Sequence, residues 1–74
     1  MTKQLCNGLK VSGQYYGKAF TGIVMEYRHH SVRDNLIIVT VSLYEPLQIY
    51  GVTRDSILID YYTNGEVNPH ACFD

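Results

Sequence analysis

The strongest constraint on the fold is a period-two pattern in the middle of the chain. Residues 36–43 alternate between two sets of side chains, one of which is apolar throughout: Ile37, Val39, Val41 and Leu43. Successive side chains of a β-strand point to opposite faces, so this pattern predicts a strand with one buried face. No window of the sequence shows sustained helical spacing. The sequence therefore predicts an all-β protein.

Turn signals divide the rest of the chain into four further strands, predicted at residues 9–12, 19–29, 47–52 and 57–62. The dipeptides Asn7-Gly8 and Asn64-Gly65 favour tight turns, and residues 13–17 form a loop between two glycines. Gly22 predicts a bulge or bend inside the long second strand. Pro46 cannot donate to a β-ladder, so Glu45-Pro46 is expected to end the third strand.

Two segments complete the prediction. Residues 53–56 are expected to form a tight turn, either irregular or a single 3₁₀ turn, and residues 67–74 form a short edge strand or a tail. Five short antiparallel strands with one glycine-bent strand predict an SH3-like barrel, since closure removes the exposed edges of a small sheet. An OB-like barrel is the alternative, although it usually has more residues and a helix. We expect a single domain over residues 1–74, with the barrel core at about 8–62 and an extension at 63–74.

The length of 74 residues limits how much surface the chain can bury. A domain of this size buries only about 60% of the surface exposed by its unfolded chain, and usually needs a staple or a partner. Cys6 and Cys72 allow one terminal disulfide, but two buried or idle thiols are the favoured interpretation. Self-association is then the expected source of further burial, and seven tyrosines are suited to a shared surface.

Charge and hydropathy argue against two classes of partner. The net charge is −1, with +4 over residues 1–33 and −5 over residues 34–74, whereas a sequence-independent nucleic-acid binder is usually basic overall. The first seven residues lack the apolar stretch of a signal peptide, and no run has membrane-spanning length. We expect a cytoplasmic protein that does not bind membranes.

The tetrapeptide Leu47-Gln48-Ile49-Tyr50 is the main candidate for a binding site. If it forms a strand, Gln48 and Tyr50 point to one face, while Leu47 and Ile49 point to the other. An amide beside a phenol, with backbone donors and acceptors between them, suits a flat heteroaromatic amide. The alternative is a solvent-facing pair on an ordinary strand.

Taken with three other islands, this tetrapeptide resembles the plasmid-borne type II dihydrofolate reductases (the DfrB family). The resemblance covers roughly fifty residues and depends on the order and spacing of the islands, because each one alone is unspecific. The islands are Gly8-Leu9-Lys10-Val11, Gly17-Lys18-Ala19-Phe20-Thr21-Gly22-Ile23-Val24, Tyr27 and Leu47-Gln48-Ile49-Tyr50.

The resemblance implies four SH3-like barrels around one central pore that serves as the active site. Gln48 from every subunit would flank the nicotinamide of NADPH and the pterin of dihydrofolate. The main-chain groups of Ile49 would hold the carboxamide and the pterin amide edge, the Tyr50 hydroxyl would contact both molecules, and Leu47 would shape the wall. The proton for the substrate would come from solvent, and trimethoprim would not inhibit.

The chain departs from the family pattern in several places. The family has a lysine after the first strand, where this chain has Ser12-Gly13-Gln14. We expect Lys18 to replace that cation at the pore edge, with Lys10 as the weaker substitute. The proline after the family's tyrosine is Gly51, the family's interface histidine has no counterpart in residues 43–46, and residues after about Asp60 extend past the family's end.

Other chemistries find less support in the sequence. His29, His30, His70 and Cys72 do not match the ligand spacing of structural zinc sites, so no metal is expected. Cys6 lacks an activating partner, and neither Asp55 nor Asp60 has a companion for acid–base catalysis.

Two non-enzymatic functions remain as alternatives. The first is a protein-interaction barrel of a phage or mobile element. The second is a nucleic-acid-binding barrel of the KOW or Tudor kind, in which Tyr15 and Tyr16 combine with Arg28 and Arg33 in an aromatic-basic patch. If Tyr15 and Tyr16 instead anchor their loop on the barrel, that patch does not form.

Overall fold

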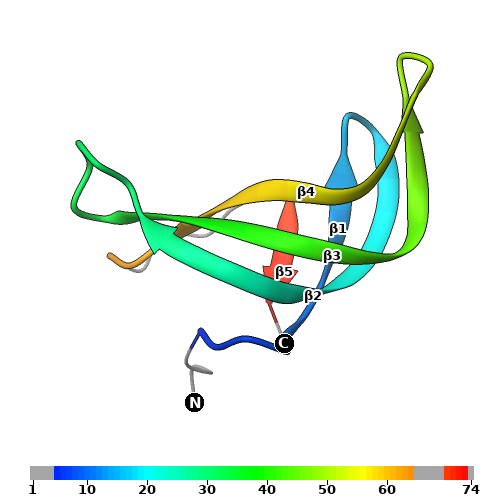
Figure 1. The fold of residues 1–74 in the computed structure, drawn as a ribbon. Helices are drawn as coiled ribbons and strands as arrows, with labels where there is room; N and C mark the ends of the chain where they lie inside the picture. Colours follow the sequence, from blue (N-terminus) through cyan, green and yellow to red (C-terminus); the bar gives the residue numbers. More distant parts are fainter. Residues whose placement is uncertain (1–4, 65–69, 74) are drawn as a thin grey trace.

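A computed structural model describes residues 5–64 and 70–73 of the chain. The described part is one five-stranded antiparallel sheet with the strand order β4-β3-β2-β1-β5 (Figure 1). Its strands are β1 (Lys10–Tyr15), β2 (Lys18–His29), β3 (Leu36–Ile49), β4 (Val52–Tyr62) and β5 (Ala71–Phe73). The prediction of an all-β fold is confirmed, and the sheet has five strands. The predicted fourth strand at residues 47–52 is wrong, because these residues are divided between β3, the turn at 50–51 and β4. None of the described residues belongs to a helix that could span a membrane.

The hydrophobic core lies on the concave face of this sheet. The apolar face predicted for the third strand is confirmed, because its four side chains are all buried. They pack with buried residues of the neighbouring strands, namely Val11, Phe20, Val24, Ile57 and Ile59. β2 and β3 are long and curl strongly, which lets a single sheet enclose its own core (Figure 1). Among the described residues, no ladder joins the two edge strands, β4 and β5, so the sheet is open.

The bend in β2 has two separate causes. The register between β2 and β3 shifts between Val24 and Glu26, which places a bulge at Met25 and not at Gly22. Gly22 serves a different purpose, because a Cβ atom at this position would lie 2.3 Å from the carbonyl oxygen of Ser42. The glycine therefore allows the backbones of β2 and β3 to approach closely, three residues before the bulge.

The predicted end of the third strand is wrong. β3 continues through Glu45-Pro46 as far as Ile49, and the predicted turn at residues 53–56 lies inside β4. The register between β3 and β4 shifts between the pairs Ser42–Ser56 and Leu47–Arg54, so residues 43–46 lie opposite Asp55 alone. The irregularity accommodates the proline, because Pro46 sits where the ladder is interrupted and its missing N–H costs no regular bond.

Two short turns share one sequence, Tyr-Gly. Tyr16-Gly17 joins β1 to β2, and Tyr50-Gly51 joins β3 to β4. All four residues have positive φ, with 51° at Tyr16, 77° at Gly17, 50° at Tyr50 and 76° at Gly51. Positive φ at both central positions characterises the type I′ hairpin turn. The predicted loop at residues 13–17 is therefore shorter than expected, since Gly13 lies in β1.

The ends of the described chain agree with several predictions. The turn at Asn7-Gly8 is confirmed, and the N–H of Gly8 donates to the carbonyl of Val24 at 2.8 Å. β5 confirms a short edge strand within residues 67–74, and it pairs with β1. The predicted turn at Asn64-Gly65 extends outside the described residues. Cys6 and Cys72 are both exposed and are not joined by a disulfide.

Candidate functional site

The two Tyr-Gly turns meet at one end of the sheet (Figure 1). The ring centroids of Tyr16 and Tyr50 are 6.0 Å apart at an interplanar angle of 75°. Those of Tyr15 and Tyr16 are 4.8 Å apart at 87°. Both are edge-to-face contacts, which aromatic rings prefer. We call this group of three rings the tyrosine tip; it leaves Tyr16 67% exposed and Tyr50 91% exposed.

The tip also brings together two residues that the sequence predicts for cofactor binding. The ammonium group of Lys18, at the start of β2, donates to the main-chain oxygen of Gln48 at 2.5 Å. Ile49 and Val52 form the last pair before the two-residue turn, so their main-chain groups face each other. The main-chain groups of the preceding residue, Gln48, then face the β1–β2 hairpin, where Lys18 reaches them.

The tetrapeptide does not have the geometry expected of a single strand. Tyr50 lies in the turn, so it does not share a strand face with Gln48. Ile49 is buried at 7% exposure, and its main chain pairs with Val52 in the ladder. Gly51 explains this difference, because a glycine at positive φ completes a hairpin turn where the family has proline.

Leu47 and Lys10 lie in a groove on one side of the tip. This groove has a volume of about 490 Å³ and is lined by Lys10, Ala19, Phe20, Thr21, Tyr44, Glu45, Pro46 and Leu47. The two lysines predicted as substitutes for the family's cation therefore approach the tetrapeptide from different sides, with Lys10 near Leu47 and Lys18 at Gln48.

The groups at the tip fit part of a nicotinamide nucleotide. The Gln48 side chain is exposed and carries both a donor and an acceptor, as the carboxamide of nicotinamide requires. Lys18 supplies a positive charge for a phosphate or carboxylate, and Tyr50 supplies an exposed ring with a hydroxyl. The main-chain groups of Ile49 are paired with Val52 in the ladder, so the contacts with the nucleotide would come from the side chains of Gln48, Lys18 and Tyr50.

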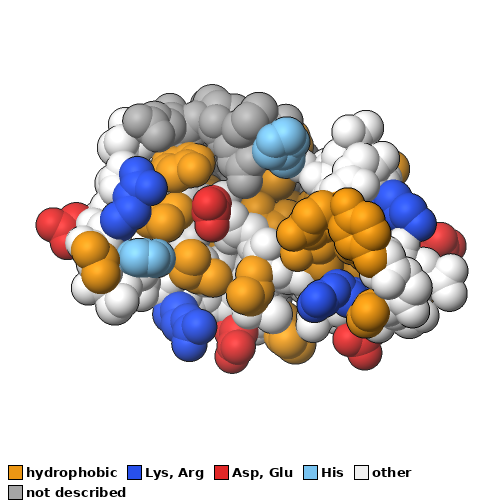
Figure 2. All heavy atoms as spheres, turned by 90° about the horizontal axis from the view of Figure 1, so that it is seen from above, with side chains coloured by type: hydrophobic (Ala, Val, Ile, Leu, Met, Phe, Trp, Pro, Cys, Tyr) orange, Lys and Arg blue, Asp and Glu red, His pale blue; other side chains and the backbone are white. Residues whose placement is uncertain are grey.

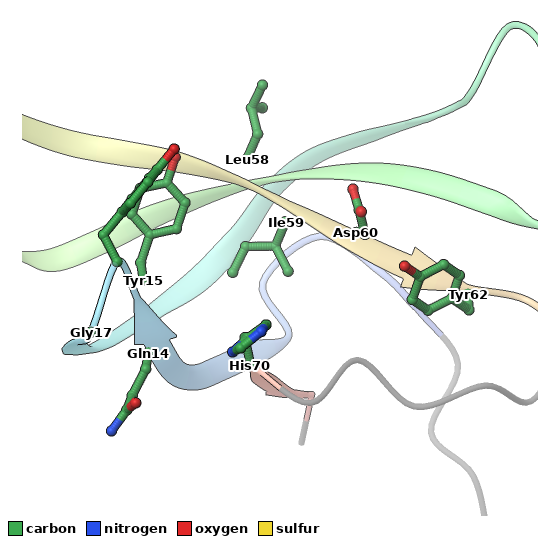
Figure 3. A pocket seen from close by; sticks show the side chains of 9 residues that line it. Gln14, Tyr15, Gly17, Leu58, Ile59, Asp60, Tyr62 and His70 are labelled. Atoms are coloured by element: carbon green, nitrogen blue, oxygen red, sulfur yellow. The ribbon is translucent and has the colours of Figure 1, made fainter.

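A second and larger hollow lies between the open edge of β4 and the end of β1. It has a volume of about 750 Å³, and we call it the seam. Its lining residues are Gln14, Tyr15, Tyr16, Gly17, Leu58, Ile59, Asp60, Tyr62 and His70. Figure 2 shows hydrophobic side chains gathered around a hollow on this face, with acidic and histidine side chains between them. In Figure 3, Tyr15 and Tyr62 lie toward its two ends, and Ile59 points into it from β4.

Neither the seam nor the contact between Tyr16 and Tyr50 was predicted from the sequence. The seam joins residues of β1 and the turn after it with residues of β4 and with His70, which are far apart in the sequence, so no local pattern marks it. The tip had a signal, because the dipeptide Tyr-Gly occurs twice, each time directly after a strand.

The predicted aromatic-basic patch does not form. Arg28 lies near the far end of β2, and Arg33 lies in the loop that follows it, whereas Tyr15 and Tyr16 lie at the opposite end of that strand (Figure 1). The length of β2 therefore separates the arginines from the rings. The nucleic-acid site predicted from these four residues is wrong.

The histidine and cysteine candidates have other positions. The Nδ1 atom of His30 accepts hydrogen bonds from the N–H groups of Val32 and Arg33, both at 3.1 Å, and so orders the loop after β2. His70 precedes β5, and its carbonyl accepts from the N–H of Gln14 at 2.9 Å. Within residues 5–64 and 70–73, no three His, Cys, Asp or Glu side chains form a group that could hold a metal ion.

No family model, no curated protein and no solved structure matches the chain. The resemblance to the type II reductases therefore depends on the sequence islands quoted above.

Proposed function

We propose that this chain is an NADPH-dependent dihydrofolate reductase of the type II kind, acting in the cytoplasm as a homotetramer. The observation that carries the proposal is the contact between Lys18 and Gln48, beside Tyr50. The resemblance assigned these residues to one cofactor site although thirty positions separate Lys18 from Gln48. Their convergence supports the assignment, because no local sequence pattern requires it.

We further propose that the sheet belongs to the SH3-like barrels and that its copies assemble through the tip, with the seam left open. Among the described residues, the curled sheet leaves a hollow, the seam, between the outer edge of β4 and the end of β1 (Figure 3). Large apolar side chains remain exposed at or near the tip, among them Tyr16, Tyr44, Tyr50 and Val52. Copies of the tip that meet around shared two-fold axes would bury these side chains and gather their glutamines in one pore.

The chemistry follows from orientation alone. When bound, NADPH would supply a hydride for the reduction of dihydrofolate to tetrahydrofolate, with the accompanying proton taken from water. Gln48 holds the carboxamide and orients the ring, and Tyr50 limits the space above it. Lys18 attracts an anionic group of the cofactor or substrate. In this proposal the proton comes from solvent, as the resemblance implies, and catalysis arises from proximity and orientation.

Two measurements on the purified chain test this proposal. Light scattering is expected to report a mass of four chains, and NADPH absorbance is expected to fall only when dihydrofolate is present. Gln48→Ala is expected to abolish turnover without unfolding the sheet, since the side chain is exposed. Gln14→Ala is the matched control, because this exposed amide lies in the seam and not at the tip.

Growth of bacteria in trimethoprim gives an independent test. Cells that express the wild-type chain are expected to grow, and cells that express Gln48→Ala are not. A stable monomer or dimer without turnover would contradict the reductase function. It would favour the alternative, a non-enzymatic SH3-like binding module, for which the 91% exposure of Tyr50 is the supporting observation.

A further inference from the structure

The seam is bordered by a strand edge whose main chain is directed into it. The N–H of Thr63 donates to the carbonyl of Asn35, just beyond the pair Leu36–Tyr62. In an antiparallel ladder, residues alternately face the partner strand and the opposite side. Ile57, Ile59 and Tyr61 therefore face β3. The main-chain groups of Leu58 and Tyr62 face the outer edge of β4, which is the wall of the seam.

The same conclusion follows from the other side of β3. The N–H of His30 donates to the carbonyl of Leu36, and Arg28 pairs with Ile38. Even-numbered residues in this part of β3 therefore face β2, and odd-numbered residues face β4. The hydrogen bond between β4 and β3 and the one between β2 and β3 therefore agree on which main-chain groups face each neighbouring strand.

Apart from the charge of Asp60, this edge lacks the features that usually protect an open strand. Natural edges are blunted by charged side chains, especially lysine, and by proline, bulges or short length. Over residues 56–62, β4 has no lysine, proline or glycine, and its pairing with β3 is regular. Leu58 is 56% exposed on this stretch. Among the described residues no strand pairs with this edge, so its geometry suits the addition of another strand.

The side chains around the edge specify the chemistry of that strand. Leu58, Asp60 and Tyr62 share one face of β4, while Ile59 points to the other face, toward Tyr15 (Figure 3). No lysine or arginine occurs among the described residues that line the seam, and Asp60 is its carboxylate. A carboxylate offers about four acceptor positions, so Asp60 can accept from a ligand in addition to contacts within the protein.

We propose that the seam binds an extended peptide segment of a partner protein in which a lysine or arginine lies between two apolar residues. The segment pairs with the outer edge of β4 as an added antiparallel strand. Its basic side chain lies opposite Asp60, with the ring of Tyr62 beside it on the same face. The two apolar side chains lie on the inner face, next to Ile59 and Tyr15. Five or six residues are the usual length of such a strand.

This site is separate from the proposed cofactor site. Gln48 and Lys18 do not line the seam, and only Tyr15 and Tyr16 of the tyrosine tip border it. The inference therefore stands whether or not the chain reduces dihydrofolate.

The test uses the ¹⁵N-labelled full chain and capped pentapeptides. The probe has a central lysine flanked by valines and terminal threonines, and its control has glutamate in place of lysine. The lysine peptide is expected to give saturable amide shifts that are larger at Leu58 and Tyr62 than at Ile57 and Ile59, because only the first pair directs N–H groups into the seam. The glutamate peptide is expected to bind at least tenfold more weakly, since it places like charges together.

A matched pair of variants isolates the charge. Asp60→Asn is expected to weaken the lysine peptide about fivefold, the effect of losing one partly exposed ion pair. Asp55→Asn is expected to change its binding by less than twofold, because Asp55 lies on the same strand outside the seam.

Four results would overturn the proposal. The first is the absence of saturable shifts with the lysine peptide. The second is equal binding of the lysine and glutamate peptides. The third is a set of shifts at Leu58 and Tyr62 that depends on protein concentration without peptide, which would show a second copy at this edge. A single-stranded oligonucleotide that produced the same shifts more tightly than the lysine peptide would also contradict it.

Discussion

The two halves of β3 differ in almost every physical respect. The first half, residues 36–43, lies between β2 and β4, and its alternate side chains are buried. The second half, residues 44–49, pairs with β4 alone, and most of its side chains are exposed. The first half holds the core together. The second half extends away from it and carries Gln48 to the tyrosine tip, so stability and proposed function occupy different parts of one strand.

The largest difference between these halves should appear when a charge is introduced in each. Val41→Asp places a carboxylate at a fully buried position and is expected to lower the free energy of unfolding by at least about 3 kcal/mol. Tyr44→Asp changes an exposed residue and is expected to stay within about 0.5 kcal/mol. Urea unfolding at concentrations where the chain is a monomer measures both. Equal losses would mean that the second half is also core.

The close approach of β2 to the first half of β3 gives the next effect. Gly22→Ala puts a methyl group against the Ser42 carbonyl and is expected to cost about 2 kcal/mol, because the two backbones must separate. Ser42→Ala leaves that carbonyl in place and serves as the control, with a loss below about 0.5 kcal/mol. A neutral Gly22→Ala variant would show that the two strands do not approach each other this closely.

A substitution in the turn that follows the second half, at Tyr50, is expected to have opposite effects on stability and on activity. Tyr50→Asn is expected to raise the free energy of unfolding by about 0.5–1 kcal/mol, since asparagine tolerates positive φ in type I′ turns better than tyrosine. The same variant is expected to lose at least about tenfold in NADPH turnover, equivalent to about 1.4 kcal/mol. Tyr16→Asn, in the other turn, is the comparison for stability. Full activity in Tyr50→Asn would remove Tyr50 from the site.

The contact between the two hairpins gives the smallest stability effect. Lys18→Met is expected to change the free energy of unfolding by less than about 0.5 kcal/mol, because the ammonium group is exposed. The KM for NADPH is expected to rise, and its dependence on salt to weaken, as one positive charge is lost. Lys10→Met provides a comparison on the groove side. A larger effect from Lys10 than from Lys18 would reverse their predicted order.

The same division explains what could be predicted from the sequence. In the first half of β3, burial forces the alternation of Ile37, Val39, Val41 and Leu43, and a period-two pattern is visible in any sequence that has it. In the second half, Pro46 and Glu45 suggested a break, yet the ladder resumes after an irregularity that only the partner strand reveals. The turn at Tyr50-Gly51 lacked the usual Asn-Gly signal, so its position was missed.

The residues of the candidate site were predicted from the sequence, but their three-dimensional arrangement was not. Lys18, Gln48 and Tyr50 were named from the sequence, and the structure brings them together. Their arrangement on a hairpin turn, and the presence of Tyr16 beside Tyr50, required the register of two separate hairpins. The seam depends on how far the sheet curls, which follows from the bulge at Met25 and the close approach at Gly22. Neither the degree of curl of the sheet nor the width of the seam can be predicted from a local sequence pattern.

The most direct test is a titration of the ¹⁵N-labelled full chain with NADPH, followed by its amide shifts. If the tip holds the cofactor, saturable shifts will appear at Lys18, Gln48 and Tyr50, and Gln48→Ala will suppress them. Shifts confined to Leu58 and Tyr62 in the seam, or no saturable shifts at millimolar NADPH, would contradict the cofactor site proposed at the tip.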